Sequence, residues 1–197
     1  LGKPVDELFP VFGEPVGAAS LAQAHRATMA DGREVAVKVL RPGIERRIAD
    51  DSATLMMAAG LIEALIPPAR RLEPAAFATT VIRSLQLELD MRFEAAGAAE
   101  LTEVMNRDGW MRAPAVVWDG VAKRVLTLEW VGGLPLSDPA TLEVPGLDRR
   151  AIADNLIRAF LAQALDYGFF HADLHEGNLF VTAPDGSTVA PQNVTRG

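Results

Sequence analysis

The sequence predicts an α+β fold with two lobes: a small antiparallel β lobe that carries long helices, then the first part of a helical lobe. Three observations predict it. Residues 11–40 alternate between apolar and polar positions and contain turn signals. Residues 44–105 change to a helical period. A glycine-containing stretch at 131–135 separates them from a second amphipathic helix that begins near Asp148.

Composition limits the classes of protein to which the chain can belong. Its 197 residues are 49 % hydrophobic and 23 % charged, which is typical of a folded globular protein. The net charge of −7 argues against a nucleic-acid-binding protein, because such a protein needs a basic surface. There is no cysteine, so disulfides, thiolate metal sites and cysteine nucleophiles are excluded. No apolar run reaches the roughly 18 residues that a membrane-spanning helix needs.

The β lobe is expected to contain a three-stranded antiparallel sheet. Its strands are predicted at 11–16, 21–29 and 34–40. Asp31 and Gly32 form the hairpin turn before the last strand. Alternation along that strand places Lys38 on the face opposite three valines, Val35, Val37 and Val39.

Two long helices are expected next. Residues 44–66 repeat apolar side chains at helical spacing and should end at Pro67, because proline cannot continue a helix. The repeating apolar positions are Ile44, Ile48, Leu55, Ala59, Ile62 and Ile66, at steps of three and four residues with one gap of seven across Asp51. The second helix is predicted over residues 73–105, with Gly97 as the place where it bends or breaks. Its buried stripe is predicted to be Phe77, Val81, Leu85 and Leu89.

The boundary between the lobes is predicted in the stretch 131–135, which gives lobes of residues 1–131 and 132–197. Asp148 is expected to N-cap a helix that ends at Gly168. The apolar face of this helix is predicted to be Ile152, Leu156, Phe160 and Ala164. The other elements expected are strands at 115–118, 124–130 and 179–182, a loop at 169–178 and a turn at 184–186.

The strongest candidate site is the loop His171-Ala172-Asp173-Leu174-His175-Glu176-Gly177-Asn178. Phosphoryl transfer from ATP uses an aspartate that orients or deprotonates the accepting group and an asparagine that binds Mg²⁺. Asp173 and Asn178 are expected to play these parts. A metal site at His171 and His175 is the competing interpretation, but no third ligand lies nearby and an Asp–Asn pair suits Mg²⁺ better than zinc.

Lys38 is the residue expected to hold the phosphates of ATP. On one continuous helix Glu88 and Asp90 would lie about 200° apart, so both cannot face Lys38. Glu88 is predicted to form the ion pair with Lys38 and to join Lys38 and Asp173 as catalytic residues. Asp90 is expected to face elsewhere in the cleft and to bind the cofactor. The ordinary alternatives are a solvated lysine and a surface pair between Glu88 and Arg92.

Two further segments are expected to bind the nucleotide. The turn with Ala18, Ala19 and Ser20 could cradle phosphates with its backbone N–H groups. Alanine in place of glycine should make this turn stiffer. Backbone groups of Glu129 and Val131 would bond to the adenine edge. A plain turn and a plain linker remain the alternatives.

Together these segments resemble the UbiB/AarF (ADCK) family of atypical kinases. The resemblance rests on Pro15-Val16-Gly17-Ala18-Ala19-Ser20, Val35-Ala36-Val37-Lys38-Val39, Glu88-Leu89-Asp90 with Glu94-Ala95-Ala96, and the loop at 171–178. It implies a protein-kinase-like two-lobe fold, ATP and Mg²⁺ as cofactors, and ATP-dependent kinase or ATPase activity that supports ubiquinone biosynthesis. It also implies that Glu88 and Asp90 are the family's acid-x-acid pair and that the turn at 18–20 is its alanine-rich loop.

The resemblance implies quinone-precursor lipids or quinone-biosynthesis enzymes as partners. The expected location is the cytoplasm, with peripheral association at the inner membrane through regions outside this chain. Two family segments are not found, a Lys-x-Gly-Gln helix and an Asp-Phe-Gly magnesium ligand near residues 191–193. We therefore expect a truncated piece that is a poor catalyst alone. Two alternatives stay open: a small-molecule phosphotransferase of the aminoglycoside or choline kinase type, and a non-catalytic nucleotide- or lipid-binding protein.

Overall fold

The computed structural model describes residues 1–168 and 174–182, and the chain divides into two compact units. Unit 1 comprises Leu1–Ala96 and Val117–Thr127, and unit 2 comprises Gly97–Val116 and the chain from Leu128 onward. The predicted lobe boundary after residue 131 stays a prediction. Asp173, the predicted turn at 184–186 and the tail at 191–197 lie outside the described residues.

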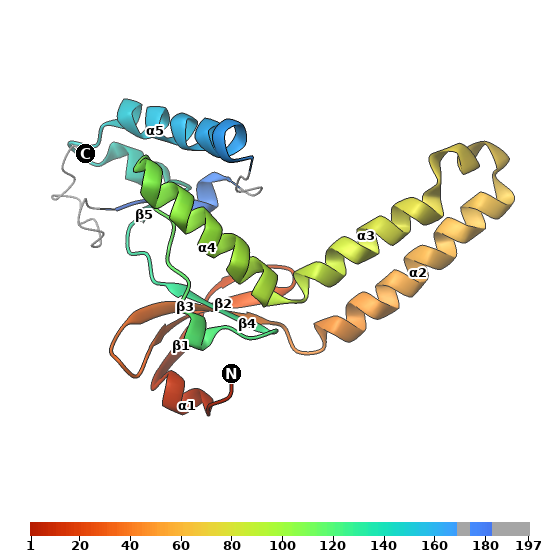
Figure 1. Cartoon of the computed structure of the whole chain (residues 1–197), viewed down its shortest axis with the longest axis horizontal. Coiled ribbons are helices and arrows are strands. Elements are labelled where there is room, and N and C mark those ends of the chain that lie inside the picture. Colours follow the sequence, from red (N-terminus) through yellow and green to blue (C-terminus); the bar gives the residue numbers. More distant parts are fainter. Residues whose placement is uncertain (169–173, 183–197) are drawn as a thin grey trace. The chain divides into compact units, whose positions relative to one another are not determined.

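The predicted antiparallel sheet is present in unit 1 (Figure 1). Its order is β1-β2-β3-β4, formed by β1 (Val11–Ala18), β2 (Ala22–Thr28), β3 (Glu34–Leu40) and β4 (Val125–Glu129), whose last two residues belong to unit 2. The register of β1 against β2 shifts on both sides of Pro15, because proline cannot donate a ladder hydrogen bond. Gly32 turns the chain between β2 and β3 with a φ of 87°, which glycine adopts without strain.

One face of this sheet forms the core of unit 1. Val35 and Val37 are 0 % and 1 % exposed, and Val39 packs against the same cluster. The other buried members are Leu8 of the short helix α1 (Val5–Leu8), Phe9, Ala27, Met29 and Val117. This arrangement confirms that the three valines share the face opposite Lys38. Each fully buried valine contributes about 1.5–3 kcal/mol of hydrophobic stabilisation.

Two helices, α2 (Ile44–Leu65) and α3 (Pro74–Glu88), form a hairpin that extends away from the sheet (Figure 1). The predicted stop at Pro67 is confirmed, since it opens the 3₁₀ turn η1 (Pro67–Leu72). The buried stripe predicted for the second helix is only partly confirmed, since Leu89 is buried, Val81 and Leu85 are half-buried, and Phe77 is exposed. In the apolar repeat of residues 44–66, Ile44, Ile48 and Ala59 are buried, whereas Leu55, Ile62 and Ile66 are exposed. Along most of the hairpin α2 packs against α3, and among the described residues the outer apolar positions stay exposed.

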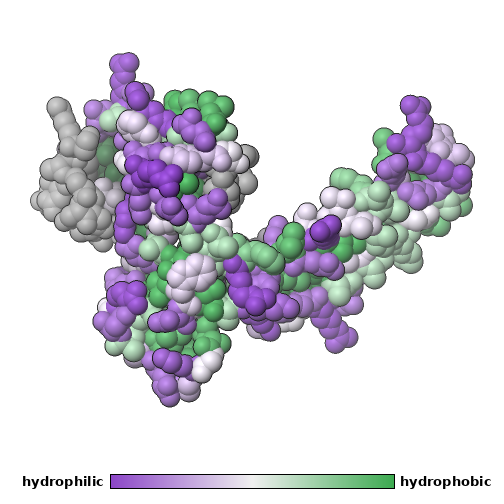
Figure 2. Space-filling view, viewed as in Figure 1, coloured by the Kyte–Doolittle hydropathy of each residue, from purple (hydrophilic) through white to green (hydrophobic). Residues whose placement is uncertain are grey.

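The hairpin therefore presents apolar surface to solvent, visible as green along its length in Figure 2. Its most exposed large apolar side chains are Met57, Leu61, Leu65, Leu72 and Phe77. Within residues 1–168 and 174–182, no helix combines the length and the apolar composition needed to cross a bilayer.

The single helix predicted over residues 73–105 is wrong. Helix α3 ends at Glu88, and α4 (Met91–Asp108) begins three residues later. The expected bend at Gly97 is also wrong, because Gly97 lies inside α4 without interrupting it.

Asp90 explains the position of the break. Its carboxylate accepts the backbone N–H of Arg92 at 3.1 Å. The N–H of Met91 donates to the carbonyl of Lys123 at 2.9 Å. Aspartate competes with the helical backbone for hydrogen bonds and favours the start of a helix. Both contacts satisfy amides of the first turn of α4, which no helical carbonyl can reach.

Unit 2 contains the second part of α4, helix α5 (Arg149–Leu161) and a two-stranded sheet of β5 (Leu134–Pro135) and β6 (Phe180–Val181). Asp148 caps α5 as predicted, since its carboxylate accepts the N–H groups of Arg150 and Ala151 at 3.1 and 3.0 Å. The helix continues as a π-helical segment, η4 (Ala162–Tyr167), and ends at Gly168 with a φ of 64°. Phe160, on the predicted apolar face of this helix, is exposed.

Of the three short strands predicted at 115–118, 124–130 and 179–182, two are present and one is not. Strands β4 and β6 confirm the predictions at 124–130 and 179–182. The predicted strand at 115–118 is reduced to one bridge between Val116 and Leu128, followed by the 3₁₀ turn η2 (Trp118–Gly120). The hydroxyl of buried Thr127 donates to the carbonyl of Gly120 at 2.9 Å and holds this turn. Unit 2 also contains two 3₁₀ turns, η3 (Pro139–Glu143) and η5 (Glu176–Asn178).

Candidate functional site

Lys38 is held by a carboxylate of α4. Its Nζ donates to the two Oε atoms of Glu94 at 2.7 and 2.9 Å. Lys38 lies on β3 opposite Ala24 of β2, and Glu94 lies in the first turn of α4. The two side chains are 36 % and 46 % exposed. Solvent screens such a pair, which contributes less than about 1 kcal/mol to stability. Its main effect is to hold the ammonium group in one place.

The prediction that Glu88 forms this ion pair is wrong. Glu88 is the last residue of α3, and its exposed carboxylate has no partner in the part of the chain that the structure describes. The prediction assumed one continuous helix. Because the chain breaks at Asp90, the first turn of α4 presents Glu94 to β3 instead. An acidic residue in the first turn after a capping aspartate is a common pattern, and it is the signal that could have identified Glu94. A catalytic role for Glu88 stays a prediction.

Asp90 is bound to its own neighbour. Arg92 donates from Nη2 and Nε to the two carboxylate oxygens at 2.6 and 2.9 Å. The hydrogen bonds from the Arg92 side chain are the main cause that lowers the pKa of Asp90 to about 2, and the charge of Lys123 lowers it further to a smaller extent. The carboxylate is therefore ionised at neutral pH. The prediction that Asp90 binds the cofactor stays a prediction.

The turn with Ala18, Ala19 and Ser20 lies at the end of the sheet where β3 finishes, since Ala22 pairs with Leu40. The N–H of Ala19 donates to the carbonyl of Ala22 at 2.9 Å, so this amide cannot bind a phosphate. The N–H and hydroxyl of exposed Ser20 have no partner among residues 1–168 and 174–182. Ser20 is thus the best-placed donor of a turn whose phosphate-binding role stays a prediction.

In unit 2, the fold already uses part of the predicted adenine-binding segment. The N–H of Glu129 donates to the carbonyl of Ala115 at 2.8 Å. The Glu129 carboxylate accepts from Nη2 of Arg112 and from the N–H of Ala115. The Glu129 N–H therefore cannot bond to a nucleobase. Its carbonyl and the backbone of Val131 are the groups for which the prediction stands.

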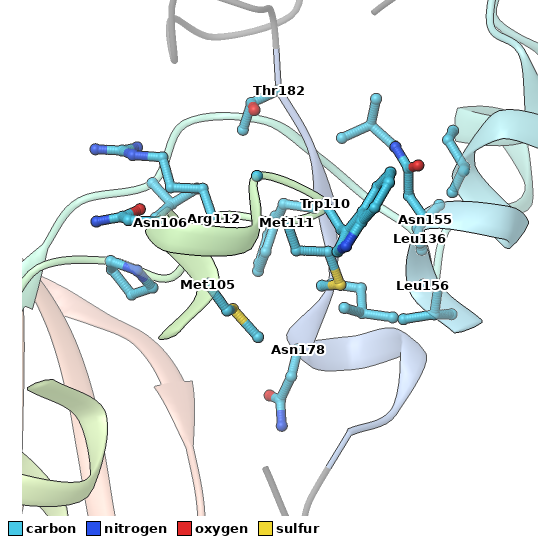
Figure 3. A pocket seen from close by; sticks show the side chains of 17 residues that line it. Met105, Asn106, Trp110, Met111, Arg112, Leu136, Asn155, Leu156, Asn178 and Thr182 are labelled. Carbon is cyan, nitrogen blue, oxygen red and sulfur yellow. The ribbon is translucent and has the colours of Figure 1, made fainter. Parts of the chain in front are cut away.

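Val131 and Asn178 both line one cavity of unit 2 (Figure 3). The cavity has a volume of about 570 Å³. Much of its lining is apolar and includes Met105, Trp110, Met111, Leu136, Ile152 and Leu156. Figure 3 shows the amide of Asn178 turned away from Trp110 and Met111. The cavity thus brings together two predicted residues, but the amide expected to bind Mg²⁺ does not point toward its aromatic wall.

Local hydrogen bonds shape the end of the predicted catalytic loop. The N–H of Asn178 donates to the carbonyl of His175 at 2.9 Å, which closes η5. Nδ1 of His175 accepts the N–H of Gly177 at 3.0 Å, so this imidazole caps the turn. In the described ranges, no three imidazole or carboxylate groups gather as a metal site. The amide oxygen of Asn178 is nevertheless of the kind that Mg²⁺ prefers. The roles predicted for Asp173 and Asn178 remain predictions.

Nearly the whole chain is similar to known proteins of one family. Residues 1–190 match the ABC1 atypical kinase-like domain. The chain is 42 % identical over 182 residues to "Probable protein kinase UbiB" of Xylella fastidiosa (strain 9a5c). It is 40 % identical over 198 residues to the protein of the same name from Xanthomonas campestris pv. campestris (strain B100). These matches cover 92 % and 98 % of this chain but 33 % and 36 % of the relatives, so the chain spans about a third of their length.

A solved structure is also similar, that of Rv3197 from Mycobacterium tuberculosis in complex with erythromycin. The TM-score is 0.70 and the sequence identity 31 %, over 94 % of this chain and 46 % of that one. The predicted α+β, kinase-like fold is confirmed. The predicted resemblance to the UbiB/AarF (ADCK) family is confirmed as well.

Proposed function

Because the chain belongs to the ABC1 atypical kinase-like family, we propose that the full-length protein binds ATP with Mg²⁺ and is an atypical kinase or ATPase of the UbiB type. The observation that carries this proposal is the ion pair between Lys38 and Glu94. In protein kinases, a strand lysine paired with a helix glutamate holds the phosphates of ATP. The pair here lies on the face of the sheet opposite the valine core and adds little stability, which favours a role in ligand binding.

Each proposed role follows from the chemistry of the side chain. When bound, ATP supplies the phosphoryl group and Mg²⁺ neutralises part of its charge. Lys38 provides a fixed positive charge, and Glu94 keeps that charge in position. Ser20 offers an N–H and a hydroxyl to phosphate oxygens. Asn178 offers an amide oxygen to Mg²⁺. Asp173 accepts the proton of the phosphoryl acceptor, a role that rests on the sequence alone.

The adenine base is proposed to lie against the segment that contains Glu129 and Val131. The carbonyl of Glu129 would accept from the exocyclic amine, since the Glu129 N–H is already bonded to Ala115. Backbone groups of Val131 would supply the second contact. Glu88 is proposed as a catalytic residue and Asp90 as a residue that binds the same nucleotide, because the resemblance to the family makes them its acid-x-acid pair.

We also propose that this activity serves quinone-lipid metabolism, as the name UbiB of the relatives suggests. The proposed partners are quinone-precursor lipids or the enzymes that process them. Peripheral association with the inner membrane would involve regions outside this chain. A small-molecule phosphotransferase is a weaker candidate because of the alanine-containing turn. A non-catalytic nucleotide- or lipid-binding protein is the other candidate, since residues 191–193 contain no acid.

ATP binding and hydrolysis by the full-length protein test the proposal. Lys38→Met is expected to weaken ATP binding at least about tenfold, because a charge-assisted contact with phosphate is lost. Glu94→Gln is expected to lower hydrolysis about tenfold with little change in Tm, because the ion pair is exposed. Lys3→Met is the matched control, since Lys3 is exposed and has no partner in the described part of the chain. ATP binding that Lys38→Met leaves unchanged contradicts the proposal.

The substrate class is tested by additions to the same assay. Faster ATP hydrolysis with a polyprenyl-phenol mimic is expected for a role in quinone-lipid metabolism. Phosphorylation of an aminoglycoside or of choline would support the small-molecule alternative. ATP binding without hydrolysis, with or without the mimic, would identify a non-catalytic protein.

A further inference from the structure

We propose that Arg41 is a positioning residue that fixes the turn at 18–20 to the strand that carries Lys38 and thereby sets the affinity for the phosphates of ATP. This inference rests on the proposed function, because it concerns the same nucleotide site. Arg41 follows directly after β3 and lies three residues beyond Lys38.

Two hydrogen bonds join Arg41 to the turn. Its Nε donates to the carbonyl of Ala19 at 3.2 Å. Its backbone N–H donates to the carbonyl of Leu21 at 2.9 Å. The two acceptors flank Ser20, the residue whose N–H and hydroxyl have no partner in the described ranges. One arginine therefore holds the peptide group that carries the Ser20 N–H and the carbonyl of the residue after Ser20.

The backbone of Arg41 is itself braced. Its carbonyl accepts from Nη2 of Arg124 at 3.3 Å. Nε of Arg124 in turn pairs with Glu45 of α2 at 3.3 Å. Because Arg41 continues the chain of β3, the turn is connected to the same rigid segment as Lys38. The separation between the Lys38 ammonium group and Ser20 is thus held by hydrogen bonds rather than left to the loop.

The guanidinium group suits this task for a chemical reason. A carbonyl oxygen that turned toward a bound phosphate would repel it. Nε of Arg41 keeps the Ala19 carbonyl occupied, and the guanidinium stays charged at any physiological pH. The described part of the chain offers no partner to the Nη atoms of Arg41, so their positive charge remains beside the turn. The expected result is a site that favours ligands with several phosphates.

The test compares Arg41→Leu and Arg41→Lys in the full-length protein, with calorimetric titration of ATP and of adenosine. Arg41→Leu is expected to weaken ATP binding about tenfold and to leave adenosine binding within about twofold, because adenosine has no phosphate. Arg41→Lys is expected to recover part of the loss, since its ammonium group can still donate to Ala19. Arg33→Leu is the matched control, because Arg33 pairs with Asp31 in the β2–β3 turn.

Hydrogen exchange provides a readout that does not depend on the nucleotide. Arg41→Leu should speed exchange of amides at 19–22 and leave those of β3 unchanged. Equal weakening of ATP and adenosine overturns the positioning role. Unchanged ATP binding by Arg41→Leu, with binding lost in Lys38→Met, overturns this inference alone. Absence of ATP binding by the unaltered protein overturns the proposed function and this inference with it.

Discussion

The sheet of unit 1 and the α2–α3 hairpin (residues 44–88) contain similar apolar side chains but bury them to very different extents. On the sheet, Leu126 is 0 % and Leu40 is 1 % exposed, whereas in the hairpin Leu61 is 58 % and Leu65 is 69 % exposed. Both sheet leucines are fully buried, while among the described residues the outer sides of α2 and α3 leave large apolar side chains exposed (Figure 2). Apolar spacing therefore shows which face a helix can bury, and only a partner decides whether it does.

The largest expected effect compares one substitution in both regions. Leu126→Ala should lower the free energy of unfolding by about 3 kcal/mol, because it leaves a cavity in a fully buried site. Leu61→Ala should change it by less than about 0.5 kcal/mol, since the side chain is mostly exposed and alanine is a good helix former. Urea unfolding of the full-length protein measures both. Equal losses would show that the hairpin is covered in solution.

Local patterns in the sequence were sufficient where a segment depends on its own neighbours. The alternation around Lys38 predicted the buried face of β3, and Asp148 predicted the start of α5. The break between α3 and α4 could not be predicted in this way. It depends on a hydrogen bond from Met91 to the carbonyl of Lys123, which belongs to a distant segment.

The same limit applies to the candidate site. Lys38 was predicted from its strand, but its partner Glu94 lies 56 positions away, and the choice depends on where the intervening helices end. The backbone of Glu129 was predicted to be available to adenine. Its N–H is used by Ala115, a contact that the pattern of residues 115–130 does not reveal. Residue types predicted the chemistry, and contacts distant in sequence decided which atoms are free for it.

A second comparison concerns two glycines and predicts effects of opposite sign. A Cβ on Gly120 would lie 2.6 Å from Cβ and 3.1 Å from Cγ2 of buried Thr127. Gly120→Ala should therefore lower the free energy of unfolding by about 2 kcal/mol through overpacking. Gly60 lies within α2 with nothing within 4 Å of such a Cβ. Gly60→Ala should raise the free energy of unfolding by up to about 1 kcal/mol. Thermal unfolding distinguishes the two, and a stabilising Gly120→Ala would contradict the packing at Thr127.

The smallest expected effect compares two aspartates with the same local partner. Asp31, in the turn of the sheet, and Asp90, just after the hairpin, each bind the arginine two positions later. Their side chains are 50 % and 13 % exposed. Hydrogen bonds from the arginine are the main cause that lowers the pKa of both carboxyl groups, and that of Asp90 falls to about 2.

A carboxyl group with a lowered pKa in the folded state stabilises that state above its unfolded pKa of about 4, and the contribution disappears as the pH falls through the folded pKa. Asp90→Asn should therefore be less stable than the unaltered protein by a small, constant amount above about pH 5. This difference should disappear between about pH 4 and pH 2, which urea unfolding across a pH series measures. Asp31→Asn should show a weaker pH dependence, because solvent screens its more exposed carboxylate. If the Asp90→Asn difference persists unchanged near pH 2, it comes from the shape of the α3–α4 junction and not from the charge of Asp90.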